Sequence, residues 1–154
     1  MNKQEFKAFC KNEFVKRGFL KYKNGYYLKG PADILCGIFL QKSDFGNYYY
    51  INYCFHIQNP SDTSIPSYYD MDMDGGRISV LSKTETDKNG NFFMTEQIEY
   101  EEYTEDEMKS FFDQEFEERI FPPINFGKKF LLDNLDKLYF LTIRPDEVRK
   151  KLQE

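Results

Sequence analysis

The sequence predicts an α+β domain in which an N-terminal helix is followed by an antiparallel meander sheet and then by helices packed on one sheet face. Three observations predict this order: an amphipathic stretch near the N-terminus, aromatic-rich runs of strand length between residues 19 and 98, and helical apolar spacing from residue 104 onward. Segregated strand and helix runs favour α+β over an alternating fold. Residues 1–154 contain no linker, repeat or low-complexity tract, so we expect a single domain.

The first expected element is a helix that begins at Asn2. Asn2 and Glu5 have the spacing of a capping box, and Gly18 has the place of a residue that ends a helix. The Asn24-Gly25 pair lies between aromatic flanks, which predicts a hairpin turn. The apolar stripe of the helix consists of Phe6, Phe9, Cys10 and Phe14.

The central part of the chain reads as a sheet of about five to seven strands. Residues 33–43 and 47–58 are long strands, and residues 44–47 supply the turn between them. Ile78 and Val80, and then residues 92–98, continue the same sheet through a turn at Asn89-Gly90. One face of the second long strand carries Tyr49, Ile51, Tyr53, Phe55 and Ile57.

The C-terminal third reads as helices. Thr104 and Glu107 form a capping box, and Pro122-Pro123 is expected to stop the helix that it opens. A last short helix begins near Pro145, with Val148 and Leu152 facing inward. The stripe of the first of these helices is Met108, Phe111, Phe112, Phe116 and Ile120, and that of the next is Phe126, Phe130, Leu131, Leu135 and Leu138.

Composition excludes several classes of function. The net charge is −5, which speaks against general binding of nucleic acids, and no apolar run is long enough to cross a membrane. The N-terminus lacks the features of a signal peptide, and the three cysteines have neither a disulfide nor a zinc pattern, so we expect a cytoplasmic protein with reduced thiols and no cofactor. The sequence does not predict the oligomeric state.

The charges are distributed unevenly along the chain. Residues 1–31 carry eight Lys or Arg against two Glu, whereas residues 96–118 carry eleven acidic groups against one Lys. Such an acidic stretch is either a solvated face or a surface that steers a cationic partner. Tyr48 and Tyr50 project from the sheet face opposite Tyr49, which is either a second core or an exposed contact surface. The candidate partner-binding residues are therefore Glu101, Glu102, Glu105, Asp106, Tyr48 and Tyr50.

The segment "DMDMDGG" resembles half of a calcium loop. Asp70, Asp72 and Asp74 occupy the first three ligand positions, followed by a glycine. The glutamate that closes such a loop is replaced by Leu81. The pattern therefore favours a short strand in which the methionines point one way and the aspartates the other, with Gly75-Gly76 as the turn that follows. Calcium binding remains a third option for function.

Nucleophilic and acid–base catalysis finds little support. His56 is the only histidine, and it shares a strand face with Cys54 and Asn52. Side chains two apart on a strand run parallel at about 6.6 Å, which disfavours a thiol–imidazole pair. No nucleophile elbow, phosphate loop or paired-cysteine motif occurs. An enzyme is therefore less expected than a binding domain.

Several stretches together resemble an uncharacterised bacterial family. They are "FCKNEFVKRGFLKYKNGYYL", "LQKSDFGNYYYIN", "EYEEYTEDE" and "LDNLDKLYFLTIR", and they are similar to domain-of-unknown-function family 4304 over almost the whole chain. The most specific piece is Gln41, Lys42 and Ser43 followed by Gly46, at the end of a buried strand. The family has no established activity, so the resemblance implies no catalytic residues. It implies a small intracellular protein of the interaction or immunity type.

The sequence thus predicts a protein-interaction domain, of the toxin-neutralising type, that binds a partly basic partner. The alternative is a ligand-binding or enzymatic domain with a pocket on the sheet near His56 and Gln41. A deep cleft with converging polar groups at that place would favour the alternative, and a flat surface there would favour the interaction domain.

Overall fold

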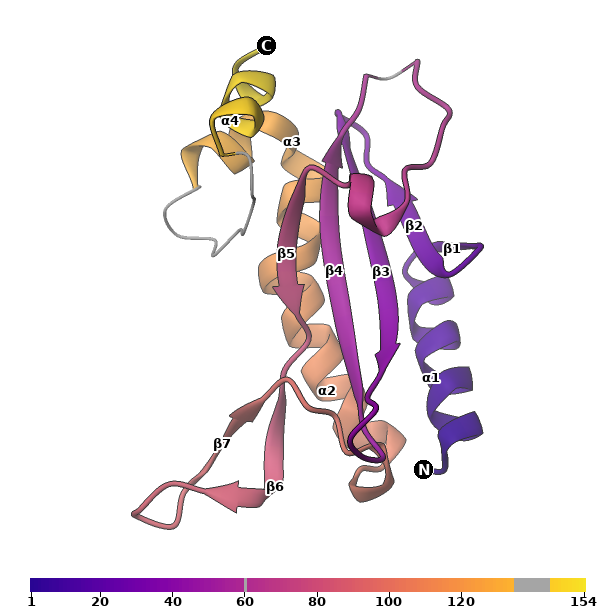
Figure 1. Cartoon of the computed structure of the whole chain (residues 1–154), viewed down its shortest axis with the longest axis vertical. Helices are drawn as coiled ribbons and strands as arrows, with labels where there is room; N and C mark the ends of the chain where they lie inside the picture. The colour runs from indigo at the N-terminus through magenta and orange to yellow at the C-terminus, as the bar shows by residue number, and fades with distance from the viewer. Residues whose placement is uncertain (60, 135–144) are drawn as a thin grey trace.

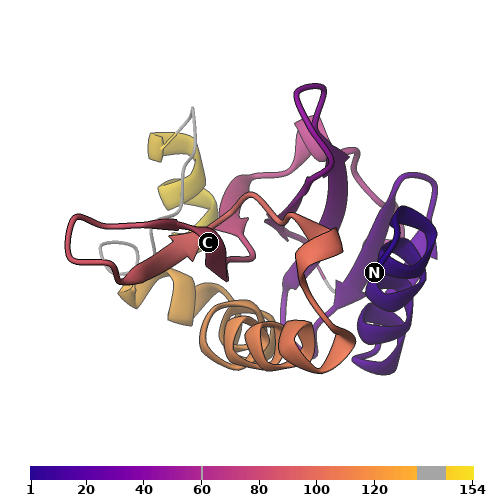
Figure 2. The ribbon, with the colours of Figure 1, turned by 90° about the horizontal axis from the view of Figure 1, so that it is seen from below.

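The computed structural model describes residues 1–59, 61–134 and 145–154 and has the predicted α+β architecture (Figure 1). Five antiparallel strands form one sheet in the order β1-β2-β3-β4-β5, and α1, α2 and α3 lie on one of its faces (Figure 2). The strands are β1 (Leu20–Tyr22), β2 (Gly25–Lys29), β3 (Ile34–Lys42), β4 (Tyr49–Ile57), β5 (Met73–Arg77), β6 (Val80–Thr86) and β7 (Phe92–Thr95). The helices are α1 (Lys3–Lys16), α2 (Glu105–Glu115), α3 (Phe121–Asp133) and α4 (Pro145–Gln153), with 3-10 turns η1 (Tyr68–Asp70) and η2 (Tyr100–Glu102) and the π-helical turn η3 (Phe116–Ile120).

Helix α1 begins and ends where the sequence predicts. The Asn2 side chain accepts a hydrogen bond from the Glu5 N–H, and the Glu5 carboxylate accepts one from the Asn2 N–H, which completes the capping box. At the other end Gly18 has φ +98°, and the Phe19 N–H donates to the Phe14 carbonyl oxygen, as in a Schellman motif. Local signals therefore define both ends of this helix.

The hairpin after α1 is confirmed, but its turn lies one residue earlier than predicted. Tyr22 pairs with Gly25, so Lys23 and Asn24 are the central residues, and Lys23 has φ +49°. Gly25 is already in β2, and glycine is needed there because a side chain would collide with the ring of Phe39. Strands β3 and β4 pair over their whole length, as the two long apolar runs predict.

The prediction for the aspartate-rich segment is wrong in two respects. Gly75 and Gly76 do not form a turn but lie inside β5, where the register against β4 shifts by one residue. Met73 joins the helix-covered core, whereas the Met71 methyl group approaches Gly37 on the opposite face of the sheet, so the two methionines do not share a face.

Strands β6 and β7 do not extend the sheet, which corrects a second prediction. They form a separate two-stranded hairpin, here called the arm (residues 80–95), that projects from the body of the molecule (Figures 1 and 2). The turn of the arm includes Gly90, as the Asn89-Gly90 pair predicts. An isolated bridge between Tyr49 and Ile98 joins the chain after the arm to β4.

Pro122 and Pro123 do not stop the helical run, which corrects a third prediction. They lie in the first turn of α3, where the missing N–H groups are tolerated, and η3 joins α2 to α3 without a break. The run is interrupted later, at Gly127 (φ +76°), where the Lys128 N–H donates to Asp33 Oδ1 at 3.0 Å. The predicted helical residues Leu135 and Leu138 lie outside the described residues.

The core lies between the sheet and the helices and is built mainly from aromatic rings. Phe112 is its centre, with ring centroids 5.3 Å from Phe9 and 5.9 Å from Phe14. Helix α4 adds Val148 and Leu152 to the same core. Among the described residues, no helix has the length and apolar character that a membrane-spanning helix needs.

Glu115 is a buried carboxyl group within this core. Its Oε1 accepts a hydrogen bond of 2.8 Å from the Tyr53 hydroxyl, and an Arg119 guanidinium nitrogen lies 4.0 Å away. Burial raises the pKa of Glu115, and the hydrogen bond from Tyr53 and the charge of Arg119 offset this only in part. The charged form is therefore less favourable in the folded than in the unfolded chain.

Replacement of Glu115 by glutamine should stabilise the protein by about 0.5–1 kcal/mol near pH 8, since the amide keeps an acceptor for Tyr53 and removes a buried charge. A raised pKa in the folded state means that wild-type stability is fully present below the unfolded pKa and falls as pH rises through the folded pKa. The difference in stability between E115Q and the wild type should therefore vanish at about pH 4. Urea unfolding of both proteins at several pH values measures this difference. Exposed Glu117→Gln is the control, and a loss of stability in E115Q near pH 8 would contradict the prediction.

Candidate functional site

The arm exposes a row of large apolar side chains. Leu81 and Met94 are paired across the two strands, so they share a face, and Phe92 lies two residues from Met94 on that face. Phe93 projects from the other side. Exposed fractions are 41% for Leu81, 49% for Phe92, 42% for Phe93 and 51% for Met94. Such a concentration on one small projecting element differs from the scattered apolar residues of an ordinary surface.

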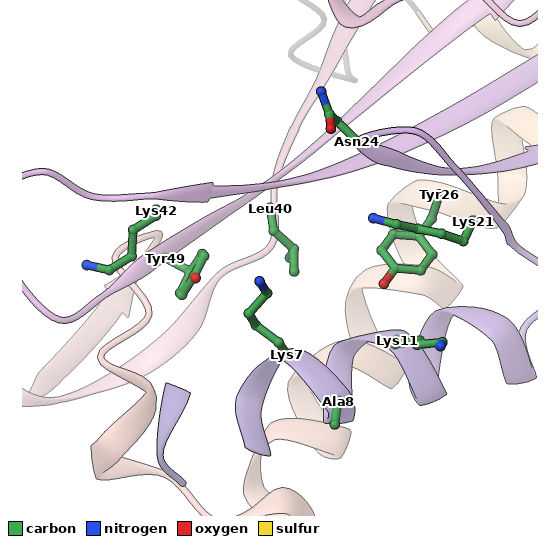
Figure 3. Close-up of a pocket in the computed structure, with 9 residues that line it drawn as sticks. All are labelled: Lys7, Ala8, Lys11, Lys21, Asn24, Tyr26, Leu40, Lys42 and Tyr49. Atoms are coloured by element: carbon green, nitrogen blue, oxygen red, sulfur yellow. The ribbon is translucent and has the colours of Figure 1, made fainter. Parts of the chain in front are cut away.

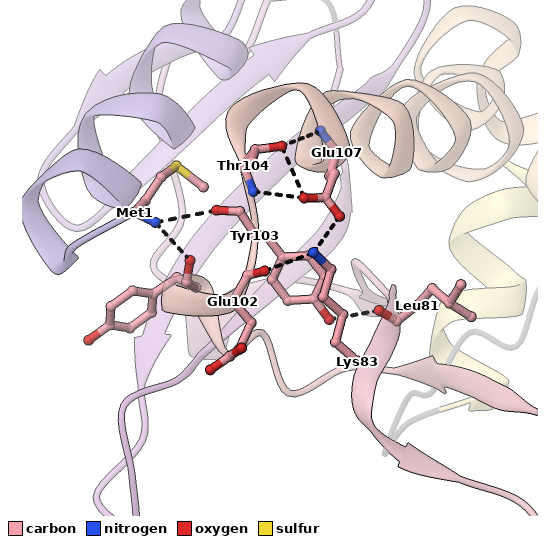
Figure 4. Close-up of polar contacts among 8 residues, drawn as sticks. Met1, Leu81, Lys83, Glu102, Tyr103, Thr104 and Glu107 are labelled. Carbon is pink, nitrogen blue, oxygen red and sulfur yellow. Dashed lines mark hydrogen bonds and ion pairs between the residues drawn. The ribbon is translucent and has the colours of Figure 1, made fainter. Parts of the chain in front are cut away.

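The base of the arm is fixed by polar contacts to η2 and α2 (Figure 4). Lys83 Nζ lies 2.6 Å from Glu107 Oε2 and donates to the Glu102 carbonyl oxygen at 2.9 Å. The Tyr103 hydroxyl donates to the Leu81 carbonyl oxygen at 2.7 Å. The hydrogen bond from Lys83 lowers the pKa of Glu107, and burial raises the pKa of Tyr103 to about 12. At neutral pH Glu107 therefore stays ionised and pairs with Lys83, and Tyr103 stays protonated and donates to Leu81.

Four of the predicted partner-binding residues lie together beside this base. Glu101 and Glu102 are in η2, and Glu105 and Asp106 are in the first turn of α2, which begins with the predicted Thr104 cap. All four side chains are exposed, and none forms an ion pair with another residue in the described part of the chain. We call these four residues the acidic ledge. Their charge is thus available to a partner.

Tyr48 and Tyr50 lie on the outer face of the sheet, which is the face opposite the helices. Their rings meet edge to face with centroids 5.6 Å apart, and the Arg77 guanidinium lies 4.1 Å from the centroid of Tyr50. Arg77 also pairs with Glu96, just after β7, at 3.5 Å. Tyr49, between the two tyrosines, contacts Tyr100 of η2 on the covered face. The two tyrosines therefore lie on the outer face of the sheet, whereas Tyr100 of η2, the turn that also holds Glu101 and Glu102, packs on the covered face.

The residues that carry the family resemblance serve mainly to close the β3–β4 turn. Lys42 Nζ donates to the carbonyl oxygens of Ser43, at 3.0 Å, and Gly46, at 2.7 Å. The Ser43 hydroxyl accepts a hydrogen bond from the Phe45 N–H. Gln41 instead accepts a hydrogen bond from Asn52 on the outer face, and Asn52 accepts one from Arg77 Nε.

The three aspartates of the calcium-like segment point to different partners. Asp70 accepts a hydrogen bond from Ser67, Asp74 accepts one from the Cys54 thiol, and Asp72 accepts one from the Ile57 N–H. Asp72 also pairs with Lys151 of α4 at 2.6 Å. The described residues contain no group of three or more His, Cys, Asp or Glu side chains placed to hold a metal ion. The geometry thus gives calcium binding no support.

His56 and Cys54 also face separate carboxylates. His56 Nδ1 lies 3.1 Å from Asp72 Oδ2, although at an angle too poor for a hydrogen bond. Burial lowers the pKa of His56 despite the nearby Asp72, and burial raises the pKa of the Cys54 thiol, with Asp74 adding to the effect. A neutral imidazole and a protonated thiol with different partners do not form a nucleophile–base pair.

The functional features that sequence reasoning missed are the exposure of the arm and the role of Lys83. The apolar run at residues 92–94 looks the same in a buried strand and in a projecting one. Only the separation of the arm from the sheet distinguishes the two.

Comparison of the chain with protein-family models, with curated proteins and with solved structures found no match. The resemblance to domain-of-unknown-function family 4304 stays a prediction that rests on the residues quoted above.

Proposed function

We propose that this protein is a non-enzymatic interaction domain whose arm and acidic ledge bind a protein partner. The observation that carries the proposal is the apolar face formed by Leu81, Phe92 and Met94 on a projecting two-stranded hairpin. A two-stranded hairpin is marginally stable alone in water, and burial of this face against a partner removes apolar surface from water. Contacts of this kind form the centre of protein interfaces.

The charges around the arm define the chemistry of the partner. The acidic ledge lies next to the base of the arm, and Glu96 and Glu99 lie between them in the sequence. A partner that offers an apolar groove with a basic rim complements both features, and its association is steered by charge. A toxin with a basic surface is one partner class that fits, which agrees with the interaction or immunity type that the family resemblance implies.

The combined substitution of Leu81→Ser and Met94→Ser should reduce affinity for the partner at least about thirtyfold, because the apolar centre of the interface is lost. Capture from native lysate identifies the partner, and surface plasmon resonance on the purified pair then measures the affinity.

Glu101→Lys with Glu102→Lys should instead slow association at low salt and weaken the salt dependence of the association rate. The binding constants at low and high salt separate the two effects.

Matched controls exist for both variants. Leu20 on β1 is an even more exposed apolar residue outside the arm, so Leu20→Ser should leave binding unchanged. Glu117 and Glu118 are adjacent exposed glutamates in η3, and their reversal to lysine should not alter the salt dependence. If the arm variant binds as wild type, or if all variants weaken binding equally, the proposal is wrong.

A further inference from the structure

A groove of about 730 Å³ lies between α1 and the end of the sheet formed by β1–β4 (Figure 3). Its volume is in the range of pockets that take small ligands. It lies on the helix-covered face of the sheet, so it is distinct from the arm, and neither His56 nor Gln41 lines it. Its lining includes Lys7 and Lys11 from α1, Lys21 from β1, Lys42 from β3, and the rings of Tyr26 and Tyr49.

The charge of this groove is of one sign. Four lysines line it, and no aspartate or glutamate does. Figure 3 shows the Lys7 amine pointing from α1 toward Leu40 in the middle of the groove, while the Lys21 chain passes over Tyr26. The Lys21 amine lies 4.7 Å from the ring centroid of Tyr26. Lysines that line one concave surface repel each other and attract an anion, although the Lys42 amine itself is turned toward the carbonyl oxygens of the β3–β4 turn.

The groove lysines have no carboxylate partner among the described residues, in contrast to the lysines that form ion pairs elsewhere in the fold. Lys16, Lys83, Lys128 and Lys151 each pair with a carboxylate. Within residues 1–59, 61–134 and 145–154, none of the four groove lysines has such a pair. The amine of Lys42 is held by two carbonyl oxygens, which leaves its positive charge uncompensated.

The floor of the groove is rigid and offers further donors. Tyr26 packs on Phe14 with ring centroids 5.1 Å apart, and Tyr49 packs on Phe6 at 5.4 Å. Both tyrosines are buried except at the groove, and burial raises the pKa of each hydroxyl, which keeps it protonated. A protonated phenol donates a hydrogen bond to an anion, and lysine binds phosphate as a point charge.

We infer that this groove binds a small molecule that carries two or three phosphate groups. A single phosphate would engage only part of the lysine set, whereas a di- or triphosphate can extend from Lys7 and Lys11 of α1 toward one of the sheet lysines, Lys21 or Lys42. An aromatic or sugar portion would lie over the apolar surface of Leu40, Tyr26 and Tyr49. The net charge of −5 opposes a long nucleic acid, which would meet acidic surface beyond the groove.

Isothermal titration calorimetry of the full chain with inorganic phosphate, tripolyphosphate and ATP tests this inference. We expect one-site binding of tripolyphosphate with Kd of about 10–100 µM at low salt, weaker binding of inorganic phosphate, and weakening with added salt. Tighter binding of ATP than of tripolyphosphate would show that the site also recognises the nucleoside. The absence of saturable binding up to about 5 mM for every probe would overturn the inference.

A pair of charge-matched variants decides whether the groove is the site. Lys7→Gln with Lys11→Gln should lower the affinity for tripolyphosphate at least about tenfold, because two of four charges are removed. Lys109→Gln with Lys129→Gln removes the same charge from exposed positions on α2 and α3 and should change the affinity less than about twofold. Circular dichroism confirms that both variants fold. Equal weakening in the two variants, or binding of a single-stranded oligonucleotide but of no small probe, would overturn the inference.

Discussion

Replacement of Phe112 by alanine should lower the free energy of unfolding by about 3–5 kcal/mol, the largest effect expected of any substitution considered. Phe112 is fully buried, and its ring contacts Phe9 of the first helix and Phe14 one turn later. These rings belong to elements about 100 residues apart in the sequence, so the cavity cannot close by a local shift. Stacked rings held by the sheet on one side and by helices on the other leave little room for collapse.

Urea unfolding followed by circular dichroism measures this loss. Phe111, the preceding residue, is a matched control, because it has the same side chain in the same helix but is only half-buried against Tyr103. Phe111→Ala should cost less than half as much as Phe112→Ala. Equal costs for the two would mean that Phe112 is not the centre of the core.

Replacement of Gly30 by alanine should lower the free energy of unfolding by about 2–3 kcal/mol. A Cβ atom at this position would lie 2.1 Å from the carbonyl oxygen of Ile124 and 2.8 Å from its Cγ2. The oxygen belongs to the backbone of α3 and cannot rotate away, so either the helix or the β2–β3 connection must move. The sequence requires glycine here because two backbones come into contact.

Thermal unfolding measures this effect as a decrease in Tm of about 5–10 °C. Pro31→Ala, at the exposed neighbouring position, is the control and should shift Tm by only a few degrees. An unchanged Tm in Gly30→Ala would show that the β2–β3 connection and α3 do not approach as closely as described.

The parts of the fold that the sequence predicts correctly are those encoded by local contacts. The Asn2 and Thr104 capping boxes, the Gly18 terminus and the core-facing positions at every second residue of β4 each depend on residues within a few positions. The errors concern tertiary context. A glycine pair is typical of a turn, but Gly75 and Gly76 lie inside β5 because Tyr53 and Phe55 fill the space that a side chain would occupy.

The candidate sites also differ in whether nearby residues in the sequence or the tertiary structure determine them. The acidic ledge follows from counting charges over a short segment, because its four residues are close in the sequence. The groove could not be predicted in this way, since Lys7, Lys21 and Lys42 lie on three separate elements. Only the strand order of the sheet and the packing of α1 against it bring them to one surface. The arm was missed because strand periodicity says nothing about whether a hairpin joins a larger sheet.

The π-helical turn η3 has a consequence for the spacing of the buried residues along the helical run. Met108, Phe112, Phe116, Ile120 and Ile124 are all buried and recur every four residues. An α-helix advances about 100° per residue, so four residues overshoot one turn by about 40°, and four such steps would carry Ile124 about 160° away from Met108. The wider turn between Phe116 and Ile120 takes up most of this excess, because a π-helical turn accommodates one residue more than an α-helical turn, which corresponds to about 100° of rotation. Deletion of the exposed Glu117 or Glu118 should therefore be absorbed by conversion of the π-helical turn into an ordinary α-helical turn, which leaves Ile124 and Leu131 on the core side.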